Sequence, residues 1–394
     1  MSAVAPGGRI RAGLLVLPMA LFLLVFFLWP LWTMVAVAIR NDAIGGALPQ
    51  TAAAILAWDG TGLPNAEIQS ALIADLRATS SADLGPAVRT LNSQVSGFRT
   101  LMGRTASAAR DTVEGETVDL IAVDDRWEDP RFWAAIRASA SPYTDRNMLA
   151  AVDLTRNEAG EIASLPATAS ANRLIVWRTF TIAGSITLIC ALIGLPYAML
   201  AASTTGWKRN ALLLAVLLPL WTSLLVRTAA WFILLQNEGI INKGLIWLGM
   251  IDGPLPLIFN RTGVVIAMTH VLLPFMVLPI FSVVSAIPKN LMPAAASMGA
   301  SPLRAFWRVL LPLSLPGLLA GSLLVFMVAI GYYITPALLG GPNDQMISSI
   351  IAFYALQTAN WGMAGALGLL LLAITTVLYL VYGRLSRAGA PTGI

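Results

Sequence analysis

Cysteine and histidine, which build many metal and catalytic sites, are almost absent from this chain of 394 residues, since it has one of each. The lone thiol, Cys190, excludes an intrachain disulfide and a cysteine-rich metal cluster. The lone imidazole, His270, excludes the zinc motifs that need two histidines. No metal or cofactor site is therefore predicted in the chain itself.

Charged residues are also scarce, at 11% of the chain, whereas apolar residues make up 57%. Soluble domains carry about a quarter charged residues and under half apolar ones. The mean hydropathy of the chain is +0.75. The composition therefore excludes a large soluble enzyme and predicts a membrane protein. A membrane enzyme is the least favoured function, because the sequence has no Gly-x-Ser-x-Gly motif and no carboxylate pair within an apolar run.

Six apolar segments are long enough to cross a bilayer core of about 30 Å as helices. They comprise residues 12–39, 179–203, 211–236, 263–287, 315–340 and 362–383. Several contain proline, which is tolerated in membrane bundles because neighbouring helices can satisfy the freed backbone groups. We therefore predict an all-α membrane protein with six transmembrane helices, some of them kinked.

The cations in the short connections predict the orientation of these helices. With the N-terminus inside, the internal segments hold nine cations and no carboxylate: Arg9, Arg11, Lys208, Arg209, Lys289, Arg304, Arg308, Arg384 and Arg387. Both termini are then cytoplasmic. The first apolar segment is too long for a cleaved signal sequence and lacks a small-residue cleavage site, so it is predicted to be retained. The net charge of +5 is thus an orientation signal, and nucleic-acid binding is not predicted.

The segment at residues 40–178 is then outside the cell membrane, with 17 acidic and 13 basic side chains and a net charge of −4. It is too long for a plain connection. Residues 65–78 and 126–140 place apolar side chains at helical spacing, which predicts a small, mostly helical extracytoplasmic domain. Partial disorder is the competing interpretation, because the segment is rich in alanine, serine, threonine and glycine.

The internal connection at residues 286–314 has the signature of a helix-turn-helix elbow. Pro293 fits the first turn of a short helix, and Gly299 can end that helix in a left-handed conformation. Ser301 and Pro302 then provide the cap and first-turn residue of a second helix. The elbow is predicted to lie outside the membrane and to end at Pro312, beside the next span.

At these residues the chain resembles the permease subunits of ATP-binding-cassette importers, and it is most similar to the spermidine/putrescine-type permeases. The family's cytoplasmic loop has the pattern Glu-Ala-Ala, three residues, Gly, then a spacer that ends in Leu-Pro. The residues that match are Ala294, Ala295, Gly299, Ala300, Ser301, Phe306, Leu311, Pro312, Pro316 and Gly317. The family's glutamate is replaced by Pro293. The resemblance extends over about two thirds of the chain and includes the stretches that begin at Leu218, Leu272 and Tyr332.

The resemblance implies a permease that imports a small polar solute across the bacterial inner membrane by ATP-driven alternating access. It implies three kinds of partner: cytoplasmic ATPase subunits that use ATP and Mg, a second permease subunit, and an extracytoplasmic solute-binding protein. The chain itself has no phosphate-binding loop, so ATP hydrolysis is expected in a separate subunit. The residues expected to dock on the ATPase are Pro293, Ala294, Ala295, Gly299, Ala300, Ser301, Arg304, Phe306 and Pro312.

The predicted domains are residues 1–39, with the N-terminus and first helix; residues 40–178, the external domain; and residues 179–394, a five-helix core with the coupling loop at 286–314. Two alternatives compete with this interpretation. The elbow could be an ordinary amphipathic connector. The whole chain could be a membrane receptor or sensor, whose external domain binds a ligand and whose internal loop recruits a signalling partner.

Polar side chains inside the predicted spans are candidates for the solute pathway, because charges in a bilayer are costly and usually face a cavity. The candidates are Arg227, Trp231, His270, Tyr332 and Tyr333. Arg227 suits a carboxylated solute such as an amino acid or an opine-like compound, whereas polyamines follow from the resemblance alone. Snorkelling of Arg227 beside an aromatic belt, and a bond from His270 to the backbone freed by Pro274, are the structural alternatives.

Overall fold

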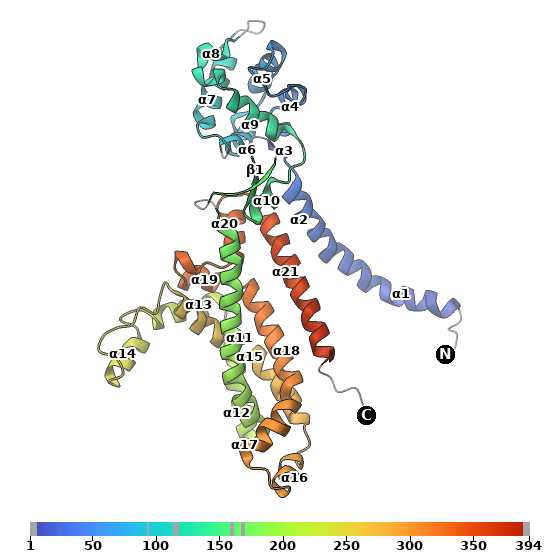
Figure 1. The fold of residues 1–394 in the computed structure, drawn as a ribbon, viewed down its shortest axis with the longest axis vertical. Coiled ribbons are helices and arrows are strands. Elements are labelled where there is room, and N and C mark those ends of the chain that lie inside the picture. The colour runs from blue at the N-terminus through green and yellow to red at the C-terminus, as the bar shows by residue number, and fades with distance from the viewer. Residues whose placement is uncertain (1–5, 93, 113–117, 158–160, 167–169, 389–394) are drawn as a thin grey trace. The chain divides into compact units, whose positions relative to one another are not determined.

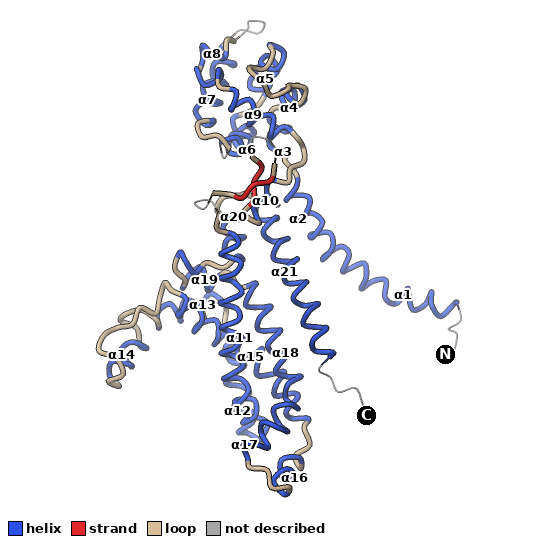
Figure 2. Tube along the Cα trace, viewed as in Figure 1, coloured by secondary structure: helices blue, strands red, loops and turns tan. Residues whose placement is uncertain are grey.

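The computed structural model describes residues 6–92, 94–112, 118–157, 161–166 and 170–388, and they are mostly helical (Figure 1, Figure 2). The chain splits into two compact units, Met1–Ala150 and Ala151–Ile394. One short antiparallel pair, β1 (Leu154–Arg156) with β2 (Ile162–Ser164), provides the sheet in the described part of the chain. The helical class of the predicted fold is therefore confirmed.

The first predicted span is a continuous apolar helix made of α1 (Pro6–Leu23), the π-helical turn η1 (Leu24–Leu28) and α2 (Trp29–Ile39). In the widened turn, Trp29 donates its backbone N–H to the carbonyl of Leu24, five residues earlier. The turn lies directly before Pro30, whose ring would clash with the carbonyl of Phe26 in a regular α-helix. The π-turn thus accommodates a proline without ending the helix.

The remainder of the first unit is a bundle of short helices: α3 (Asp42–Ala47), α4 (Pro49–Ile55), α5 (Ala66–Ala78), α6 (Ser81–Asn92), α7 (Phe98–Asp111), α8 (Leu120–Val123), η2 (Asp125–Glu128), α9 (Pro130–Ala140) and α10 (Arg146–Ala151). Both segments predicted to be helical are helical. In α5 the side chain of Asn65 caps the helix by accepting from the N–H of Ile68 at 3.1 Å. The second segment is divided into η2 and α9, because Asp129 caps a new helix at Pro130.

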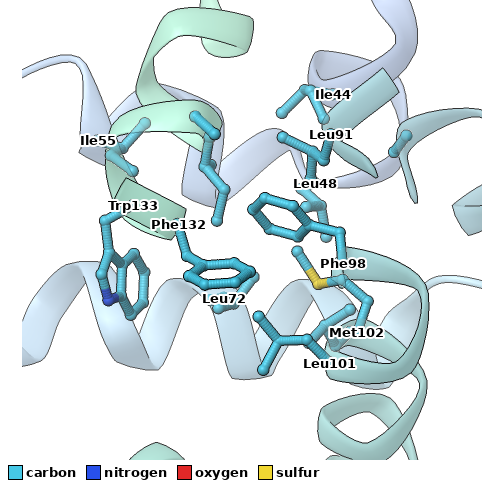
Figure 3. Close-up of a cluster of buried hydrophobic side chains, with 14 of the residues drawn as sticks. Ile44, Leu48, Ile55, Leu72, Leu91, Phe98, Leu101, Met102, Phe132 and Trp133 are labelled. Carbon is cyan, nitrogen blue, oxygen red and sulfur yellow. The ribbon is translucent and has the colours of Figure 1, made fainter. Parts of the chain in front are cut away.

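This bundle has its own hydrophobic core (Figure 3). Phe98 and Phe132 pack with ring centroids 5.0 Å apart. Trp127 and Trp133 are nearly fully buried, and each indole N–H has a partner: Trp127 donates to the hydroxyl of Thr105 at 2.9 Å, and Trp133 donates to the carbonyl of Trp127 at 3.0 Å. A buried hydrophobic core in which the polar groups have hydrogen-bond partners is typical of a domain surrounded by water.

The second unit is built around three long helices that pack pairwise: α11 (Asn172–Ser203), α15 (Arg261–Ala286) and α18 (Leu311–Gly331). Its other helices are α12 (Gly206–Leu217), η3 (Leu218–Trp221), α13 (Leu224–Leu234), α14 (Ile240–Trp247), α16 (Leu291–Ser297), α17 (Pro302–Ala305), η4 (Phe306–Leu310), α19 (Ile334–Leu339), η5 (Pro342–Asp344), α20 (Ile347–Leu356) and α21 (Trp361–Ala388). The described residues contain five helices long and apolar enough to cross a membrane, or six if one bent pair counts as a span.

The helix at the second predicted span starts at Asn172, seven residues before the predicted start. The reason is a cap from a distant residue. The carboxylate of Asp153 accepts the backbone N–H groups of Asn172 at 3.0 Å and Arg173 at 2.8 Å. These are the orphan donors of a helix start, and an anion stabilises them.

The third predicted span is not one straight helix. The helix over Gly206–Trp221 and the helix over Leu224–Leu234 meet at an angle of 101°. Pro219 lies just before the break and cannot donate to the carbonyl four residues earlier. Thr222 closes the end of the first arm by donating its hydroxyl to the carbonyl of Pro219 at 2.8 Å.

The helix at the fifth predicted span, residues 315–340, lies closer to the N-terminus than predicted, at Leu311–Gly331. The helix ends at Gly331, and α19 is a separate short helix. Pro336 explains the difference, because it has no N–H to donate to the carbonyl of Tyr332. That carbonyl instead accepts the hydroxyl of Ser348 at 2.6 Å, from the short apolar helix α20, which we did not predict.

Candidate functional site

The elbow begins with α16 and a turn at Gly299, whose φ of +82° lies in the left-handed region. Two backbone bonds define the turn: Ala300 donates to the carbonyl of Ala295 at 3.1 Å, and Gly299 donates to that of Ala296 at 2.9 Å. This pair is the Schellman arrangement that commonly ends a helix at glycine. The predicted position and role of Gly299 are therefore what the structure has.

The second helix of the elbow starts where the sequence predicted. The hydroxyl of Ser301 accepts the backbone N–H of Arg304 at 3.4 Å, and Pro302 occupies the first turn. The helix does not stop at Pro312, the predicted end of the elbow. It continues through η4 into α18, and Leu311 donates to the carbonyl of Phe306 five residues earlier. As at Pro30, a π-turn directly precedes the proline and lets the helix continue.

The elbow exposes large apolar side chains and cations together. Met298, Leu303 and Trp307 are 83%, 69% and 59% exposed, and Arg304 and Arg308 are also exposed. Among the other predicted docking residues, Pro293, Ala294, Gly299, Ser301 and Pro312 are exposed, Ala300 and Phe306 are half-buried, and Ala295 is buried. The elbow thus presents a surface of mixed apolar and basic character to a partner.

The two helices that enter and leave the elbow, α15 and α18, approach very closely at two glycines. A Cβ atom at Gly317 would lie 2.8 Å from the carbonyl oxygen of Pro279 and 2.9 Å from the Cα of Ile280. One at Gly321 would lie 3.0 Å from the carbonyl oxygen of Met276. Small residues spaced by four permit this backbone contact. These two glycines therefore allow α15 and α18 to pack backbone against backbone.

The second candidate site, a group of polar side chains, lies around the break in the third span. Arg227 folds back to the break, where its Nη2 donates to the carbonyl of Thr222 at 2.8 Å and its Nε donates to the Thr222 hydroxyl at 3.2 Å. The guanidinium therefore satisfies a carbonyl that the interrupted helix leaves open.

His270 contacts Trp231 rather than the backbone freed by Pro274. The indole N–H of Trp231 donates to Nδ1 of His270 at 3.1 Å, and the two rings meet edge to face with centroids 5.4 Å apart. The pair joins α13 to α15. Trp231 follows Arg227 by four residues in α13, so the two side chains share a helix face.

Two hydroxyl groups that we did not predict complete this region. Thr228 and Thr335 are both buried, and their hydroxyls lie 3.2 Å apart, which joins α13 to α19. The backbone of Tyr333 accepts the hydroxyl of Ser349 at 3.2 Å, while its side chain is 41% exposed. Thus, of the five predicted pathway residues, Arg227 and Trp231 share a face of α13, and Trp231 bonds to His270. Tyr332 packs against the same hydrophobic core as Trp231, and it lies three residues before Thr335, which meets the neighbour of Arg227. In the described part of the chain, Tyr333 is not among the residues packed against that core.

The sequence matches the family described as "Binding-protein-dependent transport system inner membrane component" over residues 194–388. The chain is 36% identical over 201 residues to the spermidine/putrescine transport system permease protein PotB of Escherichia coli; the match covers 51% of this chain and 73% of that protein. It is 33% identical over 232 residues to the inner membrane ABC transporter permease protein YdcU of Escherichia coli, over 56% of this chain and 73% of that one. A solved bacterial alginate ABC transporter aligns with 57% of this chain and 81% of its own, at 20% identity and a TM-score of 0.47.

Proposed function

This chain belongs to the family of binding-protein-dependent transport system inner membrane components, and we propose that it imports a small polar solute across the bacterial inner membrane, driven by ATP. It is a permease subunit and not an enzyme. The expected partners are ATPase subunits that bind ATP and Mg, a second permease and an extracytoplasmic solute-binding protein. Both termini and the elbow lie on the cytoplasmic side in this proposal, following the distribution of cations.

The observation that carries the proposal is that continuous helices connect the elbow to the polar group, by which we mean Arg227, Trp231, His270 and Tyr332. α15 carries His270 and runs for 16 further residues, about 24 Å, to the start of the elbow. α18 leaves the elbow and ends at Gly331, directly before Tyr332. Because backbone contact at Gly317 and Gly321 holds the two helices together, a displacement of the elbow would move both as one body.

The mechanism that fits this arrangement is rigid-body alternating access. ATP binding would draw the ATPase subunits together and displace the elbow, which biases the helices from an inward-facing to an outward-facing state. Hydrolysis would reset them. The residues of the polar group would then meet the solute between the two states.

Two observations bear on the class of the solute, and each supports a different class. Similarity to PotB supports a polyamine, since that protein is a spermidine/putrescine permease. Arg227 supports an amino acid or opine-like compound, since a guanidinium pairs with carboxylates.

The experiment is uptake into proteoliposomes that contain the permease with its ATPase and binding protein. We expect Gly299→Asp to lower solute uptake per ATP hydrolysed at least tenfold, because a non-glycine residue at this φ distorts the turn. Gly249→Asp is the matched control, since Gly249 also has a positive φ, of +68°, but lies outside the elbow. Full coupling in a normally assembled Gly299→Asp complex would contradict the role of the elbow, and uptake without ATPase and ATP would contradict import driven by ATP.

A further inference from the structure

The polar group around Arg227 offers hydrogen-bond donors and one fixed positive charge. Two of the three guanidinium nitrogens of Arg227 bond to Thr222, and Nη1 has no hydrogen-bond partner among the described residues. The hydroxyl of Tyr332 likewise has no recorded partner in the described part of the chain. Arg227 and Tyr332 are half-buried and His270 is exposed, so these groups remain accessible.

The contact with Trp231 decides which nitrogen of His270 faces a ligand. An indole N–H can only donate, so Nδ1 of His270 accepts and carries no proton. The proton of the neutral imidazole is then on Nε2, which becomes a donor. Trp231, one helical turn from Arg227 in α13, is therefore a positioning residue that fixes this donor.

Carboxylates that could hold an ammonium group lie elsewhere. Residues 170–388 contain three: Glu238, Asp252 and Asp344. None lies within a membrane-spanning helix. Glu238 lies 3.5 Å from the ammonium of Lys243, and Asp344 lies 3.4 Å from Nε of Arg261. A doubly charged amine in the polar group would meet Arg227 without a compensating anion, which is unfavourable in a region of low dielectric constant.

We infer that Arg227, His270 and Tyr332 form a binding site for an oxyanion, namely a carboxylate of the transported solute. Arg227 provides the charge, and Nε2 of His270 and the Tyr332 hydroxyl provide neutral donors. Thr228 and Thr335 hold α13 against α19 beside the site. This inference rests on the proposed import function and names its substrate class: solutes with a carboxylate, with or without an amine.

His270 makes a direct test possible, because it is the only histidine in the chain and its imidazole is a unique reporter. The full-length chain, labelled with ¹⁵N-histidine and purified by a tag without histidine, is studied by solid-state NMR in phosphatidylcholine bilayers. Succinate and putrescine serve as probes, because both are four-carbon ions: succinate carries two negative charges, and putrescine carries two positive charges. We expect a protonated Nε2 and unprotonated Nδ1 in the free protein, and a saturable shift with succinate but not with putrescine.

Two variants sharpen the result. Arg227→Gln is expected to raise the succinate concentration at half-saturation at least tenfold, whereas Lys208→Gln, which removes an exposed charge from α12, leaves it unchanged. A shift with putrescine instead, or no shift with either probe, would overturn the inference. So would a shift produced without solute by adding phosphatidylglycerol, since the oxyanion would then be a lipid phosphate. None of these outcomes would affect ATP-dependent uptake, which tests the import function separately.

Discussion

Close packing of α15 on α18 makes a quantitative prediction for the double variant Gly317→Ala/Gly321→Ala. Each new Cβ would lie 3.0 Å or less from a backbone oxygen of α15, and backbone cannot move aside as the end of a side chain can. Overpacking of this kind costs about 1–3 kcal/mol at each site. Alanine returns about 1 kcal/mol of helix propensity at each site. We therefore expect a net loss of about 2 kcal/mol in the free energy of unfolding.

The assay is thermal unfolding of the purified chain in detergent, followed by tryptophan fluorescence. For a unit of this size a loss of about 2 kcal/mol lowers Tm by about 4–8 °C. The control is Gly184→Ala in α11, where a Cβ would meet no atom within 4 Å. There only the propensity gain applies, so Tm should stay constant or rise. If the double variant were as stable as Gly184→Ala, the glycines would not hold the helices in contact. The proposal that α15 and α18 move as one rigid body between the elbow and the polar group would then be wrong.

Two further predictions concern other parts of the chain. In the first unit, the buried carboxylate of Asp124 accepts from Nη2 of Arg126 at 2.7 Å, and this bond holds the pKa of Asp124 below its ordinary value. The stabilisation that the ionised carboxylate provides is therefore present above about pH 4 and is lost as the pH falls through the lowered pKa. We expect Asp124→Asn to lower the free energy of unfolding by about 1.5–3 kcal/mol at pH 7, measured by limited proteolysis. The difference between the variant and the unchanged chain should vanish in acid. In the elbow, Trp307→Ala should weaken ATPase binding about 30-fold, or about 2 kcal/mol, in a pull-down titration without a change in Tm. Trp247→Ala, which removes an even more exposed indole outside the elbow, should leave ATPase binding unchanged.

Composition and apolar run length predicted most of the membrane helices, because crossing a bilayer requires both. The errors lie where a local backbone group finds a distant partner. The early start of α11 depends on Asp153, and the end of α18 depends on Ser348, whose hydroxyl donates to the carbonyl of Tyr332. The length of an apolar segment does not reveal hydrogen-bond partners that lie far away in the sequence. The break in the third span also could not be predicted from Pro219 alone, since Pro196 and Pro274 lie inside helices that continue.

The polar group was partly predictable for a related reason. A charge or an imidazole in an apolar run is conspicuous, which is why Arg227 and His270 were candidates. The threonines that organise the region, Thr222, Thr228 and Thr335, are ordinary residues of membrane helices, where their hydroxyls usually bond to their own backbone. Only the fold shows that Thr222 holds the guanidinium and that Thr228 meets Thr335.

The two units differ in what stabilises them, and this difference predicts opposite sensitivities to substitution. In the first unit, large side chains such as Phe98 and Trp133 are withdrawn from water, so truncation removes hydrophobic stabilisation. In the second unit, lipid is as apolar as the helices it surrounds, and burial against lipid contributes little to helix association. Close backbone contact at Gly317 and Gly321, and tight packing of the Met276 side chain on Gly194, take its place. Enlarging a small residue should therefore damage the second unit as much as truncating a large one damages the first.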